Sequence, residues 1–305
     1  MIRLGTRGSA LALAQANWVA ERLEGEVELV PIRTSGDEHK GTVPLSSGAA
    51  DKSRFVKELE QALLAGKIDL AVHSAKDVPT EFPDGLLLSS VGRRADPRDA
   101  ICGADSLDNL AEGAVVGTSS LRRRALLLAL RPDLDVHDLR GNVGTRLRRL
   151  ADGDFDAIVL AQAGLDRLGR GAEGHPLDPE LFVPAAGQGC LAVETRDLDP
   201  DTPSKVFGIR DFETSGCLTE ERNVVRLLEA TCNTPIGVHA VGRQDAMMKL
   251  TAFVGLPDGS RWIRDELELP FLDACSLISF NVAERLRGAG ADELLAEADR
   301  LVAAG

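Results

Sequence analysis

Residues 115–130, VVGTSSLRRRALLLAL, decide the fold class of this chain because the periodicity of their apolar side chains changes partway along. The two valines at the start are β-branched and apolar, as in a buried strand, and a Gly-Thr-Ser-Ser turn follows them. Residues 121–130 then repeat apolar side chains at helical spacing. The order strand, tight turn, helix is the elementary unit of α/β proteins.

The same unit opens the chain, because residues 2–9, IRLGTRGS, combine a strand pattern with another Gly-Thr turn. Each unit has a later counterpart in which a helix ends at a glycine and leads into a strand. Gly66 precedes a strand pattern at 68–72, and Gly153 precedes one at 155–159. We therefore predict two α/β domains of similar internal order with a ligand cleft between them. Any two strand–helix units share these features. The repeat is therefore a hypothesis that the order and direction of the strands can test.

The last third of the chain follows a different pattern. The stretch 93–99, RRADPRD, joins the two α/β units as a hinge, whereas residues after about 208 lack the strand–turn–helix unit and indicate a smaller α+β domain. The expected elements are a helix over 219–229, strands over 235–241, 249–254 and 261–267 with a Pro-Asp-Gly-Ser hairpin turn between the last two, and two closing helices.

Charge is unevenly distributed along the chain. The 305 residues carry a net charge of -13, yet residues 114–149 contain eight arginines against three aspartates. A basic cluster inside an acidic protein favours an anionic ligand at that place. The acidity of the whole argues against general nucleic-acid binding, so we expect no nucleic-acid partner.

Composition excludes several further classes. No apolar run is long enough to span a bilayer, and the N-terminal MIRLGTRGS contains no signal core, so we expect a cytoplasmic protein without a membrane partner. The five cysteines are dispersed without a CxxC, and the five histidines are dispersed without an HExxH. This spacing argues against a disulfide framework and against a metal site.

One segment of the arginine-rich stretch has the features of an anion site. Thr118, Ser119 and Ser120 precede a helix, where backbone N–H groups, hydroxyls and the helix dipole attract negative charge. Arg122 and Arg123 stand in the first turn of that helix, where cations oppose the dipole. A bound carboxylate or phosphate would explain this placement better than helix stability does.

A second segment, 140–146 (RGNVGTR), is a glycine-rich turn that carries Arg140 and Arg146, whose guanidinium groups suit carboxylates. No GxxxxGK[ST] loop occurs in the chain, which weakens a phosphate interpretation. The other arginines of the stretch are expected at the surface: Arg124, Arg131, Arg148 and Arg149.

Two further features lie outside the arginine-rich stretch. Lys76 and Asp77 come directly after a buried strand, where ligands of α/β domains bind, and a carboxylate there could act as a general acid or base. His73, inside the strand, we assign to packing or hydrogen bonding rather than catalysis. Cys232 lies on a loop without apolar flanks, which leaves its thiol accessible, although a lone cysteine is usually inert.

The chain resembles the porphobilinogen deaminase (hydroxymethylbilane synthase) family over nearly its whole length. Each shared motif is modest alone, but their combination in this order and spacing is specific. The motifs are GTRGSALALAQA (5–16), FVKELE (55–60), AVHSAKDVP (71–79), DPRDA (96–100), VGTSSLRR (116–123), LRGNVGTRL (139–147), AGLDRLG (163–169), PAAGQG (184–189) and CNTPIG (232–237).

The resemblance implies a fold and an activity. It implies two periplasmic-binding-protein-like α/β domains and a C-terminal α+β domain, divided as 1–93 with a return segment 190–207, then 94–189, then 208–305. It implies a cytoplasmic, monomeric enzyme of tetrapyrrole biosynthesis that condenses four porphobilinogens head to tail into hydroxymethylbilane. Ammonia leaves at each step, and a dipyrromethane cofactor primes the chain.

The resemblance also implies residue roles. Asp77 matches the catalytic aspartate, and Cys232 matches the cysteine that holds the dipyrromethane through a thioether. Every pyrrole carries an acetate and a propionate, so the growing product is a polyanion that an arginine-rich cleft would hold. Contacts to the cofactor or growing chain are implied for Lys76, Thr118, Ser119, Ser120, Arg122, Arg123, Arg140, Arg146 and Gly164. Contacts to the incoming substrate or elongating end are implied for Arg7, Ser9, Gln15, Arg167 and Gln188.

The chain departs from the family in two places. At 45–55 it reads LSSGAADKSRF where the family commonly has a Gly- and Lys-rich lid, and Lys52 and Arg54 are the candidates to replace the missing lysines. Cys232 follows Ala-Thr rather than the common Gly-Gly. Two other functions remain as alternatives: a non-catalytic two-domain small-anion-binding protein and a phosphate-handling transferase that uses the Gly-Thr-Ser-Ser turn.

Overall fold

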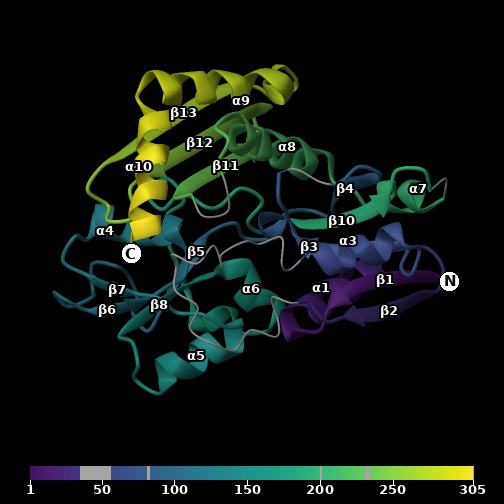
Figure 1. Ribbon diagram of the computed structural model, residues 1–305, viewed down its shortest axis with the longest axis horizontal. Coiled ribbons are helices and arrows are strands. Elements are labelled where there is room, and N and C mark those ends of the chain that lie inside the picture. Colours follow the sequence, from purple (N-terminus) through teal and green to yellow (C-terminus); the bar gives the residue numbers. More distant parts are fainter. Residues whose placement is uncertain (35–55, 81–82, 200, 231–233, 305) are drawn as a thin grey trace.

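Three sheets organise the protein (Figure 1). The computed structural model describes residues 1–34, 56–80, 83–199, 201–230 and 234–304. The predicted lid segment, 45–55, and Cys232 lie outside the described residues. Within the described ranges, no helix is long and apolar enough to cross a membrane.

The first sheet has the strand order β2-β1-β3-β10-β4. Its first three strands run parallel, and β10 runs antiparallel to both of its neighbours. Side chains alternate across β3, so that Leu70 and Val72 pack with α1, whereas Ala71 packs with α3. The elements are β1 (Ile2–Arg7), α1 (Ala10–Ala20), β2 (Val27–Ile32), α3 (Lys57–Leu64), β3 (Leu70–Ser74), the 3-10 turn η3 (Ala75–Asp77), β4 (Leu86–Val91), β10 (Leu191–Arg196) and α7 (Thr202–Phe207).

The second sheet repeats this plan in the order β7-β6-β8-β5-β9. Here β7, β6 and β8 are parallel, and β5 is antiparallel to β8 and β9. Matching order and direction confirm the repeat that the two Gly-Thr turns predicted. The elements are β5 (Asp99–Cys102), β6 (Val115–Gly117), α4 (Leu121–Leu130), β7 (Asp135–His137), α5 (Val143–Ala151), β8 (Ala157–Ala161), α6 (Gln162–Arg167), the 3-10 turn η4 (Gly171–Glu173) and β9 (His175–Pro176).

The chain crosses between the two sheets twice. After β4 it leaves the first sheet and enters the second as β5, and after the second sheet is complete it returns as β10. The crossings therefore pass through the stretch expected to be the hinge and through 184–190. Both strands that receive a crossing lie inside their sheets rather than at an edge.

The third sheet, β11-β12-β13, is antiparallel and packs against α8, α9 and α10. Together with the two α/β sheets it confirms the predicted fold class. The helix expected at 219–229 begins earlier, because Asp211 caps α8 by accepting a hydrogen bond from the backbone N–H of Thr214. The elements are α8 (Phe212–Leu227), β11 (Ile236–Gly242), β12 (Met247–Gly255), β13 (Trp262–Pro270), α9 (Phe271–Gly288) and α10 (Ala291–Ala304).

Candidate functional site

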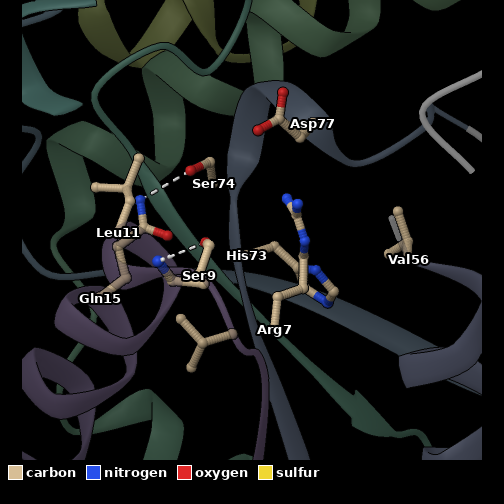
Figure 2. Close-up of a pocket in the computed structure, with 10 residues that line it drawn as sticks. Arg7, Ser9, Leu11, Gln15, Val56, His73, Ser74 and Asp77 are labelled. Atoms are coloured by element: carbon tan, nitrogen blue, oxygen red, sulfur yellow. Dashed lines mark hydrogen bonds between the residues drawn. The ribbon is translucent and has the colours of Figure 1, made fainter. Parts of the chain in front are cut away.

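A pocket opens at the carboxyl ends of β1 and β3 (Figure 2). Arg7 ends β1, and Ser9 caps α1 by accepting a hydrogen bond from the N–H of Ala12 at 3.3 Å. Gln15 is buried on α1 and donates to the Ser74 hydroxyl at 2.8 Å, which joins the helix to the end of β3. The three residues predicted for substrate contact in this part of the chain therefore line one pocket.

Asp77 lines the same pocket from η3. Among the described residues its carboxylate accepts no hydrogen bond from a side chain, and Figure 2 shows it at the side of the pocket toward which Arg7 extends. The turn that carries Asp77 is held from a distant element, because Arg222 of α8 donates to the carbonyl groups of Val78 and Pro79. The third structural unit thus fixes the backbone that presents this carboxylate.

Arg122 and Arg123 already bind a carboxylate of the protein itself. This corrects the expectation that a bound anion explains their position in the first turn of α4. Both are buried and bind Asp99: Arg122 Nη1 donates to Asp99 Oδ2 at 2.7 Å, and Arg123 Nε donates to Oδ1 at 2.8 Å. Although burial favours the neutral acid, the two guanidinium groups hold the pKa of Asp99 well below its usual range. The protein's own carboxylate explains their place at the helix N-terminus, and a cofactor contact for them stays a prediction.

Gln188 connects this ion-pair cluster to the Asp77 turn. Its side-chain N–H groups donate to Asp99 Oδ1 at 3.0 Å and to the Pro97 carbonyl at 2.8 Å, while its oxygen accepts from Lys76 Nζ at 3.2 Å. Both flanking glycines have positive φ, and a Cβ on Gly189 would lie 2.6 Å from the Ala95 carbonyl oxygen. The GQG turn therefore needs its glycines to place Gln188 between the two sheets.

A second, smaller pocket lies beyond β6 and is lined by Thr118, Ser119 and Ser120. Arg124 also lines it and donates to the Val136 carbonyl at 2.7 Å, so it is half-buried rather than fully at the surface. The reason is that the first turn of α4 faces β7, which its own sequence does not reveal. Arg140 pairs with Asp138, which lines the same pocket, at 2.7 Å.

Two half-buried arginines have no carboxylate partner among the described residues. Arg146 donates to the Gly141 carbonyl at 2.8 Å and to the Ser119 hydroxyl at 3.4 Å, and burial lowers its pKa to about 10. Arg167 donates to the Gly189 carbonyl at 2.8 Å, and burial lowers its pKa as well. Cations held partly out of water without an acid create a site that favours an anion.

The two α/β units meet where α1 contacts α6, beside the first pocket, which Leu11 of α1 lines. Gly164 of α6 is buried there, and a Cβ at this position would touch Leu11 of α1 at 3.7 Å. Burial lowers the pKa of Arg146, and the charges of Asp138 and of Asp77, which comes from the other α/β unit, oppose that effect. Residues that are far apart in sequence thus form one site between the two sheets.

Sequence reasoning missed three residues that the structure brings to this site. Ser74 is the last residue of β3, within the AVHSAKDVP motif, and no role was predicted for it. Asp99 is the last residue of the hinge stretch and the first residue of β5. Only the structure shows that it binds two arginines. Arg222 lies on α8, and no local signal connects it to Pro79.

Comparison with known proteins agrees with the site. The model of the porphobilinogen deaminase dipyrromethane cofactor-binding domain matches residues 2–204, and that of the porphobilinogen deaminase C-terminal domain matches 216–288. A porphobilinogen deaminase of Deinococcus radiodurans is 44% identical over 303 residues, covering 96% of this chain and 97% of the relative. One of Brevibacillus brevis is 42% identical over 303 residues, covering 97% and 96%.

Solved structures show a more distant likeness. The second substrate-binding domain of a putative amino acid ABC transporter from Streptococcus pneumoniae is 13% identical, with a TM-score of 0.40, over 68% of this chain and 91% of that one. Scores at this level carry no functional inference, whereas the family models and the relatives cover nearly the whole chain. The chain belongs to the porphobilinogen deaminase family of transferases, which serve tetrapyrrole biosynthesis.

Proposed function

We propose that this chain condenses four porphobilinogen molecules head to tail into hydroxymethylbilane, with Asp77 as the catalytic carboxylate. The observation that carries the proposal is that one site contains both a carboxylate and several guanidinium groups. Asp77 and Arg7 line one pocket, and Arg146 and Arg167 stand nearby without carboxylate partners in the described part of the chain. Porphobilinogen matches this arrangement because it carries two carboxylates and one aminomethyl group.

The residues present also fit a dipyrromethane. This group is a polyanion with an acetate and a propionate on each ring, and the half-buried guanidinium of Arg146 lies 3.4 Å from the Ser119 hydroxyl on the side of α4. Thr118, Ser120, Lys76 and Arg140 supply further donors around it, and Gly164 leaves room beside α6. When bound, the dipyrromethane supplies the free α-carbon at which the chain starts to grow.

The chain's own residues have separable roles in this proposal. Arg7 and the hydroxyl and amide groups of Ser9 and Gln15 bind the carboxylates of the incoming porphobilinogen. Loss of ammonia breaks the bond between the aminomethyl carbon and its nitrogen and leaves positive charge on the pyrrole. The carboxylate of Asp77 stabilises that charge and holds the pyrrole N–H. Gln188 links the two α/β units around the site, and Arg167 contacts a carboxylate of the incoming substrate or of the elongating end.

We further propose that Cys232 holds the dipyrromethane through a thioether. It lies on the chain between α8 and β11, outside the described residues. Three of the four described cysteines, Cys102, Cys190 and Cys217, are poorer candidates because they are buried, and burial also raises the pKa of the half-buried Cys275. Burial also raises the pKa of Cys102 and Cys190 to about 11 and that of Cys217 to about 12, which disfavours the reactive thiolate.

The sheets also bear on how the chain divides into domains. The membership of β5 and β10 in their sheets supports a division into 1–93 with 190–207, then 94–189, then 208–305. We propose a cytoplasmic monomer without a nucleic-acid partner, on the strength of the acidic composition.

Intact mass of the purified protein tests the proposal. We expect an adduct equal to two pyrrole units, which disappears in Cys232→Ser, and consumption of porphobilinogen with release of ammonia by the wild type only. An unmodified wild-type chain that still makes hydroxymethylbilane would remove the cofactor assignment. Anion binding without turnover in either protein would favour the alternative of a non-catalytic binding protein.

A further inference from the structure

A buried histidine–glutamate pair forms part of the wall of the Asp77 pocket. His73 Nε2 lies 2.8 Å from Glu194 Oε2, and both side chains are buried. The two residues sit diagonally across neighbouring strands, because Glu194 of β10 is in register with Ala71, two residues before His73 on β3. The imidazole also lines the pocket, together with Arg7 and Asp77 (Figure 2).

The environment of Glu194 shows that this pair is more than a packing contact. Its second oxygen, Oε1, is buried without a hydrogen-bond partner in the described residues. Glu60 of α3 is buried against the same face, and its pKa is raised by burial and by the charge of Glu194. A buried carboxyl oxygen without a partner is costly, so the contact with the imidazole is the interaction that holds Glu194 in place.

The pair fixes which imidazole nitrogen faces the ligand. The carboxylate oxygen of Glu194 accepts a hydrogen bond from His73 Nε2, so this nitrogen carries the proton. In a neutral ring, Nδ1 is then left as an acceptor. Nδ1 makes no hydrogen bond to any described residue, while the ring lines the pocket. A lone pair is therefore available on the pocket side, in a site whose other charged wall groups are Arg7 and Asp77.

We propose that His73 is a further substrate-binding residue, whose Nδ1 accepts a hydrogen bond from the aminomethyl ammonium of the incoming porphobilinogen. This inference rests on the proposed function. The charged groups that face the imidazole are Glu194 from β10, Glu60 from α3, Arg7 from β1 and Asp77 from η3. Arg7 takes a carboxylate of the substrate, and the His73 and Asp77 side of the pocket takes its cation.

His73→Gln is the matched test, because the amide N–H of glutamine can replace Nε2–H toward Glu194, whereas its acceptor oxygen does not occupy the position of Nδ1. We expect an unchanged thermal midpoint and an intact adduct mass, with KM for porphobilinogen raised about tenfold, as befits loss of one hydrogen bond to a charged group.

Long-range ¹H–¹⁵N spectra of the imidazole groups give a readout that does not depend on activity. In an Asp77→Asn background, which slows turnover, the His73 signals should show a proton on Nε2 and should shift when porphobilinogen is added. Glu194→Gln should lose the tautomer preference and raise KM in the same direction. This second variant carries the test if His73→Gln fails to fold.

An unchanged KM in a folded His73→Gln enzyme would overturn the inference, as would His73 signals that do not shift when porphobilinogen is added. In both cases wild-type turnover leaves the proposed function standing. Failure of the wild type to consume porphobilinogen would overturn the proposed function instead, so the two failures are distinguishable.

Discussion

Arg94 and Glu221 form a buried ion pair that ties the first crossing of the chain to the third structural unit. Arg94 Nη1 lies 2.5 Å from Glu221 Oε1, and the side chain of Glu221 is fully buried. The same carboxylate accepts from the backbone N–H groups of Gly187 and Ala240, and Arg94 Nε donates to the Gln188 carbonyl. One ion pair therefore joins both crossings and β11.

Removing one partner of this pair should destabilise the protein strongly. Burial opposes the charge of Glu221, but Arg94 holds the pKa of Glu221 below its usual range. The pair is therefore ionised in the folded protein. Glu221→Gln leaves the buried Arg94 uncompensated, and we expect a loss of about 3–5 kcal/mol in the free energy of unfolding by urea. The control Asp154→Asn breaks the exposed pair with Arg149 and should cost less than about 1 kcal/mol. Equal costs would contradict this account.

Packing of the third unit on α4 can be tested with two glycines of similar φ. Gly259 (φ 71°) turns the β12–β13 hairpin against α4, where a Cβ would lie 2.4 Å from the backbone nitrogen of Ala129. Gly153 (φ 81°) has nothing within 4 Å of a Cβ. Gly153→Ala should cost about 1 kcal/mol for the left-handed backbone alone, whereas Gly259→Ala should cost roughly 1–3 kcal/mol more. Similar unfolding midpoints for the two variants would show that the hairpin does not press on α4.

The fold class followed from local patterns, while the partners of the charged residues did not. The Gly-Thr turns and the glycine-ended helices predicted the repeated sheets, because each pattern reports backbone preferences within a few residues. The start of α8 was missed because its first turn, Phe212-Glu-Thr-Ser-Gly, contains weak helix formers that only the Asp211 cap and tertiary packing stabilise. Local patterns could not predict the partners of the site residues, as Arg122 shows, because its carboxylate partner lies 23 residues away in the sequence.

Acid should weaken the protein partly through Asp69. A hydrogen bond from Arg3 lowers the pKa of Asp69 to about 2, with burial opposing it. A lowered folded-state pKa contributes stability that is complete above the unfolded value of about 3.9 and is lost as pH falls toward 2. Urea unfolding from pH 6 to pH 2 should therefore show wild type and Asp69→Asn converging in acid. A stability difference that does not change with pH would refute the assignment.

Asp77 provides the sharpest test of catalysis. Asp77→Asn keeps the size of the side chain and removes its charge, so we expect the mass adduct to remain while kcat falls at least about a hundredfold. Asp152→Asn, on the exposed end of α5, is the control and should retain wild-type kcat. Release of ammonia by Asp77→Asn at a near-normal rate would remove Asp77 from its proposed role.

The arginines of the site should separate into structural and ligand-binding groups. Arg122→Met leaves the buried Asp99 with one guanidinium fewer and should lower the free energy of unfolding by about 3 kcal/mol. Arg146→Met removes a half-buried cation that has no carboxylate partner in the described ranges, so the cofactor-free chain should be as stable as before or more so. Its cost should appear in function, as a smaller fraction of chains carrying the adduct and slower product formation. Urea unfolding of cofactor-free protein and intact mass measure the two effects separately. If Arg146→Met proved as destabilising as Arg122→Met yet incorporated the adduct fully, Arg146 would be a structural residue like its neighbours, and the anion site would need another cation.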